Sequence, residues 1–486
     1  MKFVQTHLKK ILLALGLAAL WTGCSFAPKY TRPDIETPSA FKENSDTNSP
    51  AGTNIWQAAQ PNDATIRSNW WETFNDTQLN SLEDQVAVSN QNVVAAFENF
   101  LSAHAIVREA QSQYFPTLVF NPSVSRSRAF LGGGSALRNP YINNYDIPLD
   151  ASWQPDLWGS VRNTVKANTA EAQASAAILE NTKLSAQAEL ASDYFQLEGQ
   201  DALEELFDDT VKAYSNSVKL TQVLFKTGID SEQDVAQAET QLKTTEAEAT
   251  NLRIFRAQLE HAIAVLIGRP PETFSIPRAA LNATSPPVPA GLPSQLLQRR
   301  PDIASAERSV IAANAQIGVA RAAYFPNVTL SAAGGFESAT AGSLFNWSSH
   351  VWSIAAGASE TVFDAGLRYQ TVAQYKAQYQ SSVAQYRQTV LTAFQEVEDN
   401  LVTIGTLKIQ IQQQDEAVVA SQKYLDLAMY RYKLGIDSYL NVVVAQTSLL
   451  NNRQTQVNLY IQQMTSSVQL INNLGGGWDA SQLPKN

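Results

Sequence analysis

Residues 372–394 read VAQYKAQYQSSVAQYRQTVLTAF and lie within 366–433, a stretch of about seventy residues without proline. Apolar side chains recur at steps of three and four, as on one face of a helix: Val372, Tyr375, Tyr379, Val383, Tyr386, Val390, Phe394, Val397, Leu401, Ile404, Leu407 and Ile411. Much of the opposite face is glutamine. A continuous helix of this length rises ~1.5 Å per residue and reaches roughly 100 Å. The stretch predicts an elongated protein, and taken alone it is equally compatible with a solvent-exposed coiled-coil rod.

The sequence repeats this pattern at 158–226, and both stretches end in nearly identical turns. The turns read KTGIDS at 226–231 and KLGIDS at 433–438. Other landmarks recur in the same order and at nearly constant offset: Tyr-Phe-Pro at 114–116 and 324–326, and Asp156 and Asp364. A glycine is also expected to interrupt each long helix at the matching place, Gly199 in the first and Gly405 in the second. Landmarks that repeat in order predict an internal tandem duplication.

Each half is predicted to contain a helix, a strand hairpin, a very long helix, a turn and a return helix. The first repeat covers 74–275, with its hairpin at 117–154, long helix at 158–226 and return helix at 231–268. The second covers 294–475, with the corresponding elements at 327–363, 366–433 and 438–474. A proline-rich linker, 276–293, joins the repeats, and 476–486 is predicted as a C-terminal tail.

The N-terminus has the pattern of a bacterial lipoprotein signal. Three lysines precede an apolar run at 11–20, which is too short to span a bilayer and therefore predicts an export signal at 1–23. Cys24 follows a small residue and is the single cysteine of the chain, so we expect it to be acylated; an incidental thiol is the alternative. Position 25 is serine and not the aspartate that retains lipoproteins in the inner membrane, which favours the outer membrane. Prolines at intervals through 24–73 predict an extended tether.

Composition excludes several classes of function. The net charge of −10 becomes −13 when the signal and its three lysines are removed, and no Lys/Arg cluster suggests a nucleic-acid partner. Four histidines lie far apart, which gives no metal-ligand spacing. The chain contains no glycine-rich phosphate loop and no GxSxG or HExxH motif. We expect no enzyme activity and no cofactor apart from the lipid on Cys24.

The predicted hairpins alternate in polarity. In 146–154 the apolar Ile147, Leu149, Ala151 and Trp153 fall on one face and polar residues on the other, and the segments 118–125, 328–336 and 352–359 alternate in the same way. Four such strands of about ten residues are typical of a transmembrane β-barrel. Four strands cannot close a barrel, and open edges do not occur in lipid. The strands are therefore expected to be pooled among several chains; a soluble sandwich is the alternative.

Several motifs together resemble the lipoprotein branch of the TolC-like outer membrane factors, over nearly the whole mature chain. They are CSFAPKY at 24–30 with Pro33, WxxFxDxxL at 71–79, PDLWG at 155–159, RPDI at 300–303 with IGVA at 317–320 and FP at 325–326, and YxxG at 432–435. The resemblance implies a mixed fold: a homotrimer whose twelve pooled strands form one membrane β-barrel and whose helices form an α-helical barrel, a periplasmic tunnel closed at its tip. It also implies a periplasmic adaptor and an inner-membrane efflux pump as partners.

Candidate functional residues lie at the two turns, which a rod of this length places far from the strands. Gly228 and Gly435 suit the left-handed position that ends a helix, and with Ile229 and Ile436 they are the predicted adaptor contacts. Ser231 and Asp234 fit a capping box. The resemblance implies that polar side chains narrow the tip; the gate candidates are Asp230, Asp234, Tyr432, Asp437 and Asn441. In the second repeat, positions where the family often carries acids hold Asn441 and Val444, so a double acidic ring and a divalent-cation block are not expected.

Three functions are compatible with these observations. The preferred function is a passive exit duct for drugs or other small toxic compounds in the outer membrane. The second is the outer channel of a type I protein secretion system, which the sequence separates poorly from the first. The third is a lipid-anchored periplasmic coiled-coil structural protein, against which the alternating strands argue.

Overall fold

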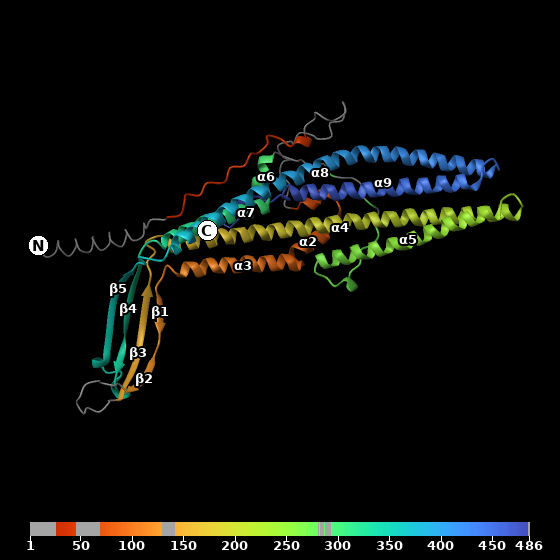
Figure 1. The fold of residues 1–486 in the computed structure, drawn as a ribbon. Helices are drawn as coiled ribbons and strands as arrows, with labels where there is room; N and C mark the ends of the chain where they lie inside the picture. Colours follow the sequence, from red (N-terminus) through yellow and green to blue (C-terminus); the bar gives the residue numbers. More distant parts are fainter. Residues whose placement is uncertain are drawn as a thin grey trace.

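The computed structural model describes residues 26–44, 69–128, 141–279, 281, 286 and 293–484. The predicted signal, Cys24, and parts of the tether, the first hairpin tip and the linker lie outside the described residues. Figure 1 shows an elongated helical body with one β-sheet projecting from one end. Among the described helices, none combines the length and apolar composition needed to cross a bilayer.

Four helices form most of the body. The long helices α4 (Ser160–Lys226) and α8 (Leu367–Lys433) contain 67 residues each, and the return helices α5 (Glu232–Leu266) and α9 (Tyr439–Asn473) contain 35 each. At ~1.5 Å per residue these lengths are about 100 Å and about 50 Å. Each long helix pairs with its own return helix, and in Figure 1 both pairs end at the same extremity, remote from the sheet.

All four helices begin and end at positions related by an offset of 207 residues. The two helix glycines are related by 206 residues, so they are not equivalent, and both helices continue through them without interruption. A Cβ on Gly199 would collide with the Ile461 side chain of α9, whereas a Cβ on Gly405 would meet nothing within 4 Å. The expectation that glycines mark matching interruptions was wrong, because Gly199 serves a close helix contact instead.

Shorter helices pack around the sheet-proximal half of the long helices. They are α2 (Thr77–Ser89), α3 (Gln91–Ser112), α6 (Pro293–Arg299) and α7 (Pro301–Ala322), and α7 packs against both α4 and α8. The largest core cluster joins α2, α4, α5 and α9 with η3 (Trp70–Phe74), whose Trp70 is fully buried. The predicted tether boundary at 73/74 therefore cuts through a packed turn, because the bulky side chains of η3 belong to the core.

The sheet contains β1 (Thr117–Phe120), β2 (Ser123–Arg128), β3 (Tyr141–Trp153), β4 (Asn327–Ser338) and β5 (His350–Ser359) in antiparallel order β1-β3-β4-β5, with β2 also paired to β3. The pairs Phe120↔Leu149 and Ser123↔Asp146 keep one register, so β1 and β2 follow a single line along β3. The line breaks between β1 and β2, where Pro122 lies, opposite the part of β3 that contains Pro148. Proline has no N–H to donate to a ladder, which explains why the structure has five strands where four were expected.

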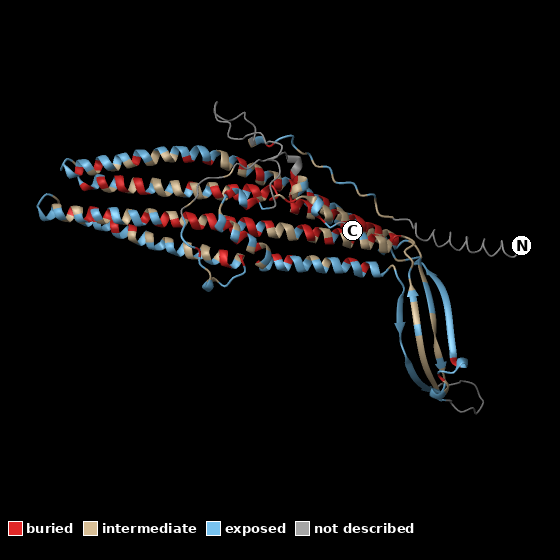
Figure 2. Ribbon diagram, turned by 180° about the vertical axis from the view of Figure 1, so that it is seen from behind, coloured by how far each residue is buried: buried red, intermediate tan, exposed pale blue. Residues whose placement is uncertain are grey.

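The sheet sorts its side chains by face. Directly paired residues share a face, so the apolar Leu118, Phe120, Ile147, Leu149, Trp153, Leu330, Trp352 and Ile354 lie together on one side, which we call the apolar face. Most residues on the other side, which we call the polar face, are small or polar. Figure 2 colours most of the sheet exposed or intermediate. Both faces are therefore open in the single chain.

Residues 26–41 extend along the helical body from the end that carries the sheet (Figure 1). Phe26 stacks on Phe325 with ring centroids 4.3 Å apart, and Phe325 stacks on Trp158 at 5.0 Å. At the other end of this segment, Glu398 of α8 accepts hydrogen bonds from the backbone N–H groups of Lys42 (2.7 Å) and Glu43 (3.1 Å). The described part of the predicted tether is thus extended but held against the body by side-chain contacts.

The predicted C-terminal tail and linker also pack against the body where they are described. Trp478 and Leu483 are buried against Ala177 and Ala304, so residues 476–484 do not project freely. In the predicted linker, Ile276 is buried, its N–H donates to Glu260, and the N–H of Ala279 donates to Asp201. Boundaries drawn from proline content alone missed these contacts, because they depend on helices distant in the sequence.

Candidate functional site

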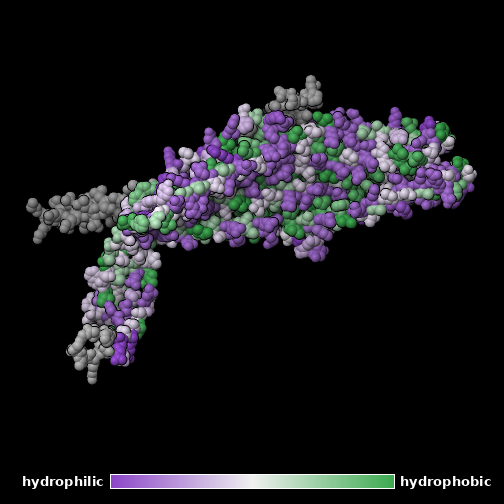
Figure 3. Space-filling view, in the orientation of Figure 1, coloured by the Kyte–Doolittle hydropathy of each residue, from purple (hydrophilic) through white to green (hydrophobic). Residues whose placement is uncertain are grey.

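The candidate site is the pair of helix turns at the extremity remote from the sheet, α4–α5 and α8–α9 (Figure 1). The structure brings together candidates about two hundred residues apart in the chain: Asp230 in the first turn contacts Tyr432 at the end of α8. Ile229 and Ile436 are 67% and 57% exposed. The turns therefore present apolar side chains to the surroundings at the end of the rod, where Figure 3 shows hydrophobic residues among hydrophilic ones.

Both turns use glycine for the same conformational reason. Gly228 has φ +75° and Gly435 has φ +70°, in the left-handed region where a side chain is unfavourable. The N–H of Gly228 donates to Phe225 O (2.9 Å), and the N–H of Gly435 donates to Tyr432 O (2.8 Å). A Cβ at either glycine would meet nothing within 4 Å. The glycines are thus required by the backbone and not by crowding, which leaves the outer surface of each turn free.

The two return helices begin differently. In α5 the capping box predicted from the sequence is present: Ser231 Oγ accepts from the Asp234 N–H, and the Asp234 carboxylate accepts from the Ser231 N–H (3.3 Å) and hydroxyl (2.7 Å). In α9 the N-cap Ser438 makes no side-chain cap, and Asn441 is exposed. The Asp234 carboxylate is therefore engaged in the helix start, which is the structural role that the sequence left as an alternative to a gate role.

The contact between Tyr432 and Asp230 connects the two helix pairs. The Tyr432 hydroxyl donates to Asp230 Oδ2. Tyr432 is 3% exposed and stacks edge-on against Tyr439 at 5.2 Å, so its ring is held in place. Burial, followed by the hydrogen bond to Asp230, raises the pKa of the Tyr432 hydroxyl well above its usual range. The hydroxyl therefore remains a proton donor at physiological pH and ties the second pair to the first turn.

Asp437 makes a different contact, within its own turn. Arg431 Nε donates to Asp437 Oδ2 (2.6 Å) and Arg431 Nη2 donates to Oδ1 (3.2 Å). This bidentate hydrogen bond lowers the pKa of the Asp437 carboxyl from its usual range. The Arg431 side chain is 52% exposed, so water screens the pair. Arg431 was not among the residues predicted from the sequence, although its positive charge next to Tyr432 could have indicated it.

An apolar cluster lies between the four helices next to the turns. It joins α4 and α5 to α8 and α9 through Tyr214, Val218, Ala238, Leu242, Ala428, Tyr432, Tyr439, Val442 and Ala445. Within this region Gln446 Nε2 donates to Ser217 Oγ at 3.0 Å, and both residues are buried. One helix pair cannot move away from the other without exposing this cluster and breaking the Gln446–Ser217 hydrogen bond. The two pairs are therefore coupled in the single chain.

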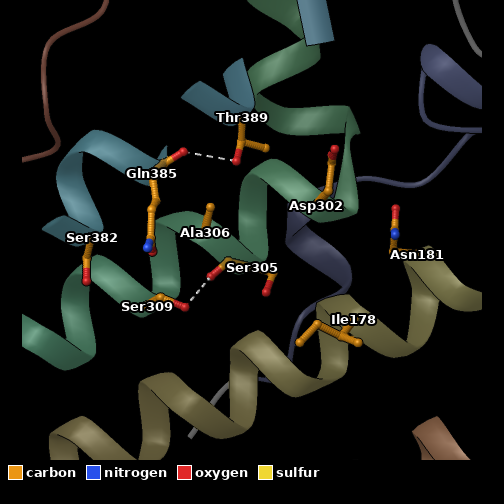
Figure 4. Close-up of a pocket in the computed structure, with 9 residues that line it drawn as sticks. All are labelled: Ile178, Asn181, Asp302, Ser305, Ala306, Ser309, Ser382, Gln385 and Thr389. Carbon is orange, nitrogen blue, oxygen red and sulfur yellow. Dashed lines mark hydrogen bonds between the residues drawn. The ribbon is translucent and has the colours of Figure 1, made fainter. Parts of the chain in front are cut away.

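The cavities of the described structure lie elsewhere. A cavity of about 260 Å³ opens between α4, α7 and α8, lined by Ile178, Asn181, Asp302, Ser305, Ala306, Ser309, Ser382, Gln385 and Thr389 (Figure 4). Ser309 and Thr389 donate to backbone carbonyls of their own helices, and Asp302 pairs with Arg300. Three of the polar side chains that line this cavity are therefore already engaged within the protein. Within the described ranges, no three His, Cys, Asp or Glu side chains gather closely enough to hold a metal ion.

The elongated helical body and the sheet with one apolar face narrow the protein families to which this chain can belong. A model of the family described as "Outer membrane efflux protein" matches residues 82–269 and again residues 292–476. The chain belongs to this family. It is accordingly an efflux channel of the outer membrane, with a helical extension into the periplasm.

Relatives of known name match over almost their whole length. The chain is 32% identical to the probable efflux pump outer membrane protein TtgC of Pseudomonas putida, covering 96% of each chain. It is 33% identical to the solvent efflux pump outer membrane protein SrpC of Pseudomonas putida, covering 95% of this chain and 97% of SrpC. It is 30% identical to the cation efflux system protein CusC of Escherichia coli, covering 96% of this chain and 98% of CusC. These relatives are named for different cargoes although their identities to this chain are similar, so overall similarity does not assign a cargo.

Solved structures share the architecture. The outer-membrane channel OprN superposes with a TM-score of 0.87 at 28% identity, covering 94% of this chain and all of OprN. CusC superposes with a TM-score of 0.81 at 27% identity, covering 93% of this chain and all of CusC. The open state of the Neisseria gonorrhoeae MtrE channel superposes with a TM-score of 0.78 at 25% identity, covering 94% of this chain and 99% of MtrE. The arrangement of helices and sheet described above is therefore that of an outer membrane channel.

Proposed function

We propose that the chain forms, as a homotrimer, the exit duct of a tripartite efflux system, with a twelve-stranded barrel and a periplasmic helical tunnel. A periplasmic adaptor and an inner-membrane pump deliver drugs or other small toxic compounds, which the duct conducts passively. The observation that carries the proposal is the sheet, which has one apolar face and two unpaired edges, formed by β1 with β2 and by β5. An open edge in lipid leaves backbone groups unpaired, so the sheet needs further copies to close.

The internal repeat indicates how the copies meet. Within one chain, the first long helix contacts the second return helix: Gly199 of α4 lies against Ile461 of α9, and Ser217 of α4 accepts a hydrogen bond from Gln446 of α9. The offset of 207 residues assigns each of these positions an equivalent in the other half of the chain. A tandem duplication would use equivalent surfaces for equivalent contacts.

The equivalent positions are exposed in the single chain. Thr406 and Tyr424 on α8 correspond to Gly199 and Ser217, and Ile254 and Glu239 on α5 correspond to Ile461 and Gln446. Ile254 is 54% exposed, Tyr424 is 43% exposed, and Thr406 and Glu239 are also exposed. Their chemistry is complementary, since a tyrosine hydroxyl can donate to a carboxylate. We therefore expect α8 of one copy to pack against α5 of the next, around a threefold axis.

Engineered disulfides test this arrangement. Thr406→Cys combined with Ile254→Cys should produce covalent dimers and trimers in isolated outer membranes. Gly405→Cys combined with Ile254→Cys is the matched control, because neighbouring helix residues point about 100° apart and this pair should not react. Equal yields for the two pairs, or no crosslink for the first, would refute the interface. If the protein without engineered cysteines shows no heat-resistant trimers on gels, the homotrimer itself is refuted.

The lipid anchor is part of the same proposal. Phe26 stacks at the junction between sheet and helices, and Cys24 precedes it by two residues, outside the described residues. This position suits a lipid inserted in the inner leaflet, where the sheet enters the membrane. Mass spectrometry of the N-terminal peptide should find Cys24 as the first residue with covalent acyl chains. An unmodified Cys24 behind an intact 1–23 segment would show that the lipoprotein interpretation is wrong.

The tip turns are the proposed gate and the adaptor-binding surface. Asp230 and Tyr432 link the helix pairs, Asp437 stabilises its own turn, and Asp234 and Asn441 lie at the starts of the return helices. The exposed Gly228–Ile229 and Gly435–Ile436 segments would contact the adaptor. Only a partner that binds the open tip more tightly than the closed tip can shift the equilibrium towards opening. Replacing Gly228 or Gly435 with valine should therefore abolish transport while leaving trimers in the membrane.

A photo-crosslinker at Ile229 and Ile436 in living cells tests the partner assignment. Capture of an adaptor from a proton-driven drug pump would support efflux and locate the docking surface. Capture of an adaptor from an ATP-driven exporter would favour type I protein secretion, the alternative duct function. If neither turn captures a periplasmic adaptor, the docking assignment is wrong.

A further inference from the structure

The charged side chains of the sheet are sorted between its two faces. Asp146, Asp150 and Glu337, which are the carboxylates of β1–β5, all lie on the polar face. Asn144 Nδ2 donates to Glu337 Oε1 at 3.0 Å and holds that carboxylate there. Arg126 and Arg128, which are the arginines of these strands, lie on the apolar face. The apolar face therefore carries positive charge without a carboxylate on the same face of the described strands.

The two arginines form a compact group with one aromatic ring. Arg126 and Arg128 are two residues apart on β2, so their side chains project to the same side. The Arg126 Cζ lies 4.9 Å from the centroid of the Tyr141 ring, and the Arg128 Cζ lies 5.6 Å from it. Arg128 pairs directly with Tyr141 across the strands, and both arginines are exposed. The ring therefore lies close to both guanidinium groups, and among the described residues no hydrogen bond engages their N–H groups.

The height of this group in the membrane follows from the strand geometry. The inner end of β3 is marked by Trp153, whose Nε1 donates to Tyr114 O at the junction with the helices. Arg126 pairs with Asn143, ten residues from Trp153 along β3. At ~3.3 Å per residue and a tilt of ~40°, ten residues rise about 25 Å, which is the height of the apolar band of a barrel. Arg126, Arg128 and Tyr141 therefore lie at the outer boundary of the bilayer, facing lipid.

We propose that Arg126, Arg128 and Tyr141 form a binding site for the phosphate of a phosphorylated glycolipid in the outer leaflet of the outer membrane. The inference rests on the proposed barrel, which directs the apolar face of the sheet towards lipid. Planar guanidinium groups donate two parallel hydrogen bonds to a phosphate, and two of them side by side match a doubly charged group. The outer leaflet of this membrane is built mainly from glycolipid that carries phosphate on its sugar headgroup, so the site faces that class of lipid.

Lipid retention by the purified protein tests the site. The full-length protein is reconstituted into nanodiscs of phosphatidylcholine with a small fraction of bisphosphorylated lipid A, and native mass spectrometry counts the lipid A that stays bound during detergent washing. The double variant Arg126→Gln/Arg128→Gln should bind lipid A about thirtyfold more weakly, because each arginine near an anionic membrane surface contributes about a fivefold factor. The charge-matched control is Arg253→Gln/Arg387→Gln, which removes two exposed arginines of α5 and α8.

Four comparisons of lipid retention decide the outcome. Equal retention by the wild type and the Arg126/Arg128 variant would overturn the site, as would an equal loss in the Arg253/Arg387 control. Dephosphorylated lipid A should not be retained, and its retention would show that phosphate is not the recognised group. Phosphatidylglycerol retained as tightly as lipid A would overturn the assignment to a glycolipid. Heat-resistant trimers and dye efflux are measured on the same proteins. If the Arg126/Arg128 variant forms trimers, supports efflux and binds lipid A as the wild type does, only the lipid site is refuted. If the wild type forms no trimers, the proposed barrel is refuted.

Discussion

Removal of one hydroxyl group, Tyr432→Phe, should loosen the tip of the channel. The hydroxyl donates to the Asp230 carboxylate across the two helix pairs, and the ring remains packed against Tyr439 in the variant. A hydrogen bond to a charged group contributes about 1.5–3 kcal/mol, and the lower value applies because Asp230 is partly exposed. A change of ~1.4 kcal/mol corresponds to a factor of ten, so the open tip should become about tenfold more populated per protomer.

Conductance of single trimers in planar bilayers measures this equilibrium directly, and entry of a large antibiotic that the outer membrane normally excludes measures it in cells. Tyr430→Phe is the matched control, since its side chain is 62% exposed and its hydroxyl has no hydrogen bond within the described ranges. In an Asp230→Ala background, Tyr432→Phe should have no further effect, because the acceptor is already missing. Unchanged conductance in Tyr432→Phe, or additive effects of the two substitutions, would refute the proposed link.

Three further predictions concern stability. Gly335→Ala should destabilise the sheet by about 1–3 kcal/mol and reduce the yield of trimers, because its Cβ would collide with the Ile147 carbonyl oxygen and Pro148 Cα; Gly334→Ala, with nothing within 4 Å, should retain the wild-type yield on unheated gels. Gly405→Ala should stabilise α8 by up to about 1 kcal/mol, because alanine favours the helix more than glycine does. Gly199→Ala should not stabilise α4, because its Cβ would collide with the Ile461 side chain. The unfolding midpoints of the two variants in denaturant are compared by circular dichroism. Glu83 of α2 is fully buried, neither of its carboxylate oxygens has a hydrogen-bond partner in the described structure, and burial, with a smaller effect of Asp84, raises its pKa well above the usual range. Because the pKa of Glu83 is higher in the folded state, the stability of the protein falls as the pH rises above the pKa of the unfolded chain, about 4.3. Glu83→Gln should therefore raise the melting temperature more at pH 8 than at pH 5. A gain that does not depend on pH would show that the buried Glu83 carboxylate is not its cause.

Sequence patterns predicted those features of the fold that depend on interactions between residues close together in the chain. The alternation in 146–154 corresponds to one strand with Ile147 and Trp153 on the same face, and the spacing of Ser231 and Asp234 predicted a capping box that the structure contains. The left-handed turn positions of Gly228 and Gly435 followed from the same kind of reasoning. Each of these features depends on backbone geometry within a few residues, which the sequence states directly.

The candidate site was predicted only as a set of positions. Asp230 and Tyr432 were both gate candidates, but their mutual hydrogen bond joins residues 202 apart and depends on how the helix pairs pack. The role of Arg431 could not be predicted from the sequence, because its bidentate contact with Asp437 depends on the path of the turn. The burial of Trp478, within the predicted tail, and the close contact between Gly199 and Ile461 likewise require helices from both halves of the chain.

The periodic elements, the two equivalent turns and the alternation of the sheet could be predicted from the amino-acid sequence, because helix and strand spacing are properties of the chain alone. Which face of each element meets which partner depends on how the elements pack together. Gly199 and Thr406 occupy equivalent positions of the repeat, yet Gly199 lies against α9 and Thr406 is exposed. Likewise, Arg126 and Asp146 are both charged residues of one hairpin, and only the strand register places them on opposite faces. Register and packing are set by contacts over long separations, and such contacts leave no local pattern from which to predict them.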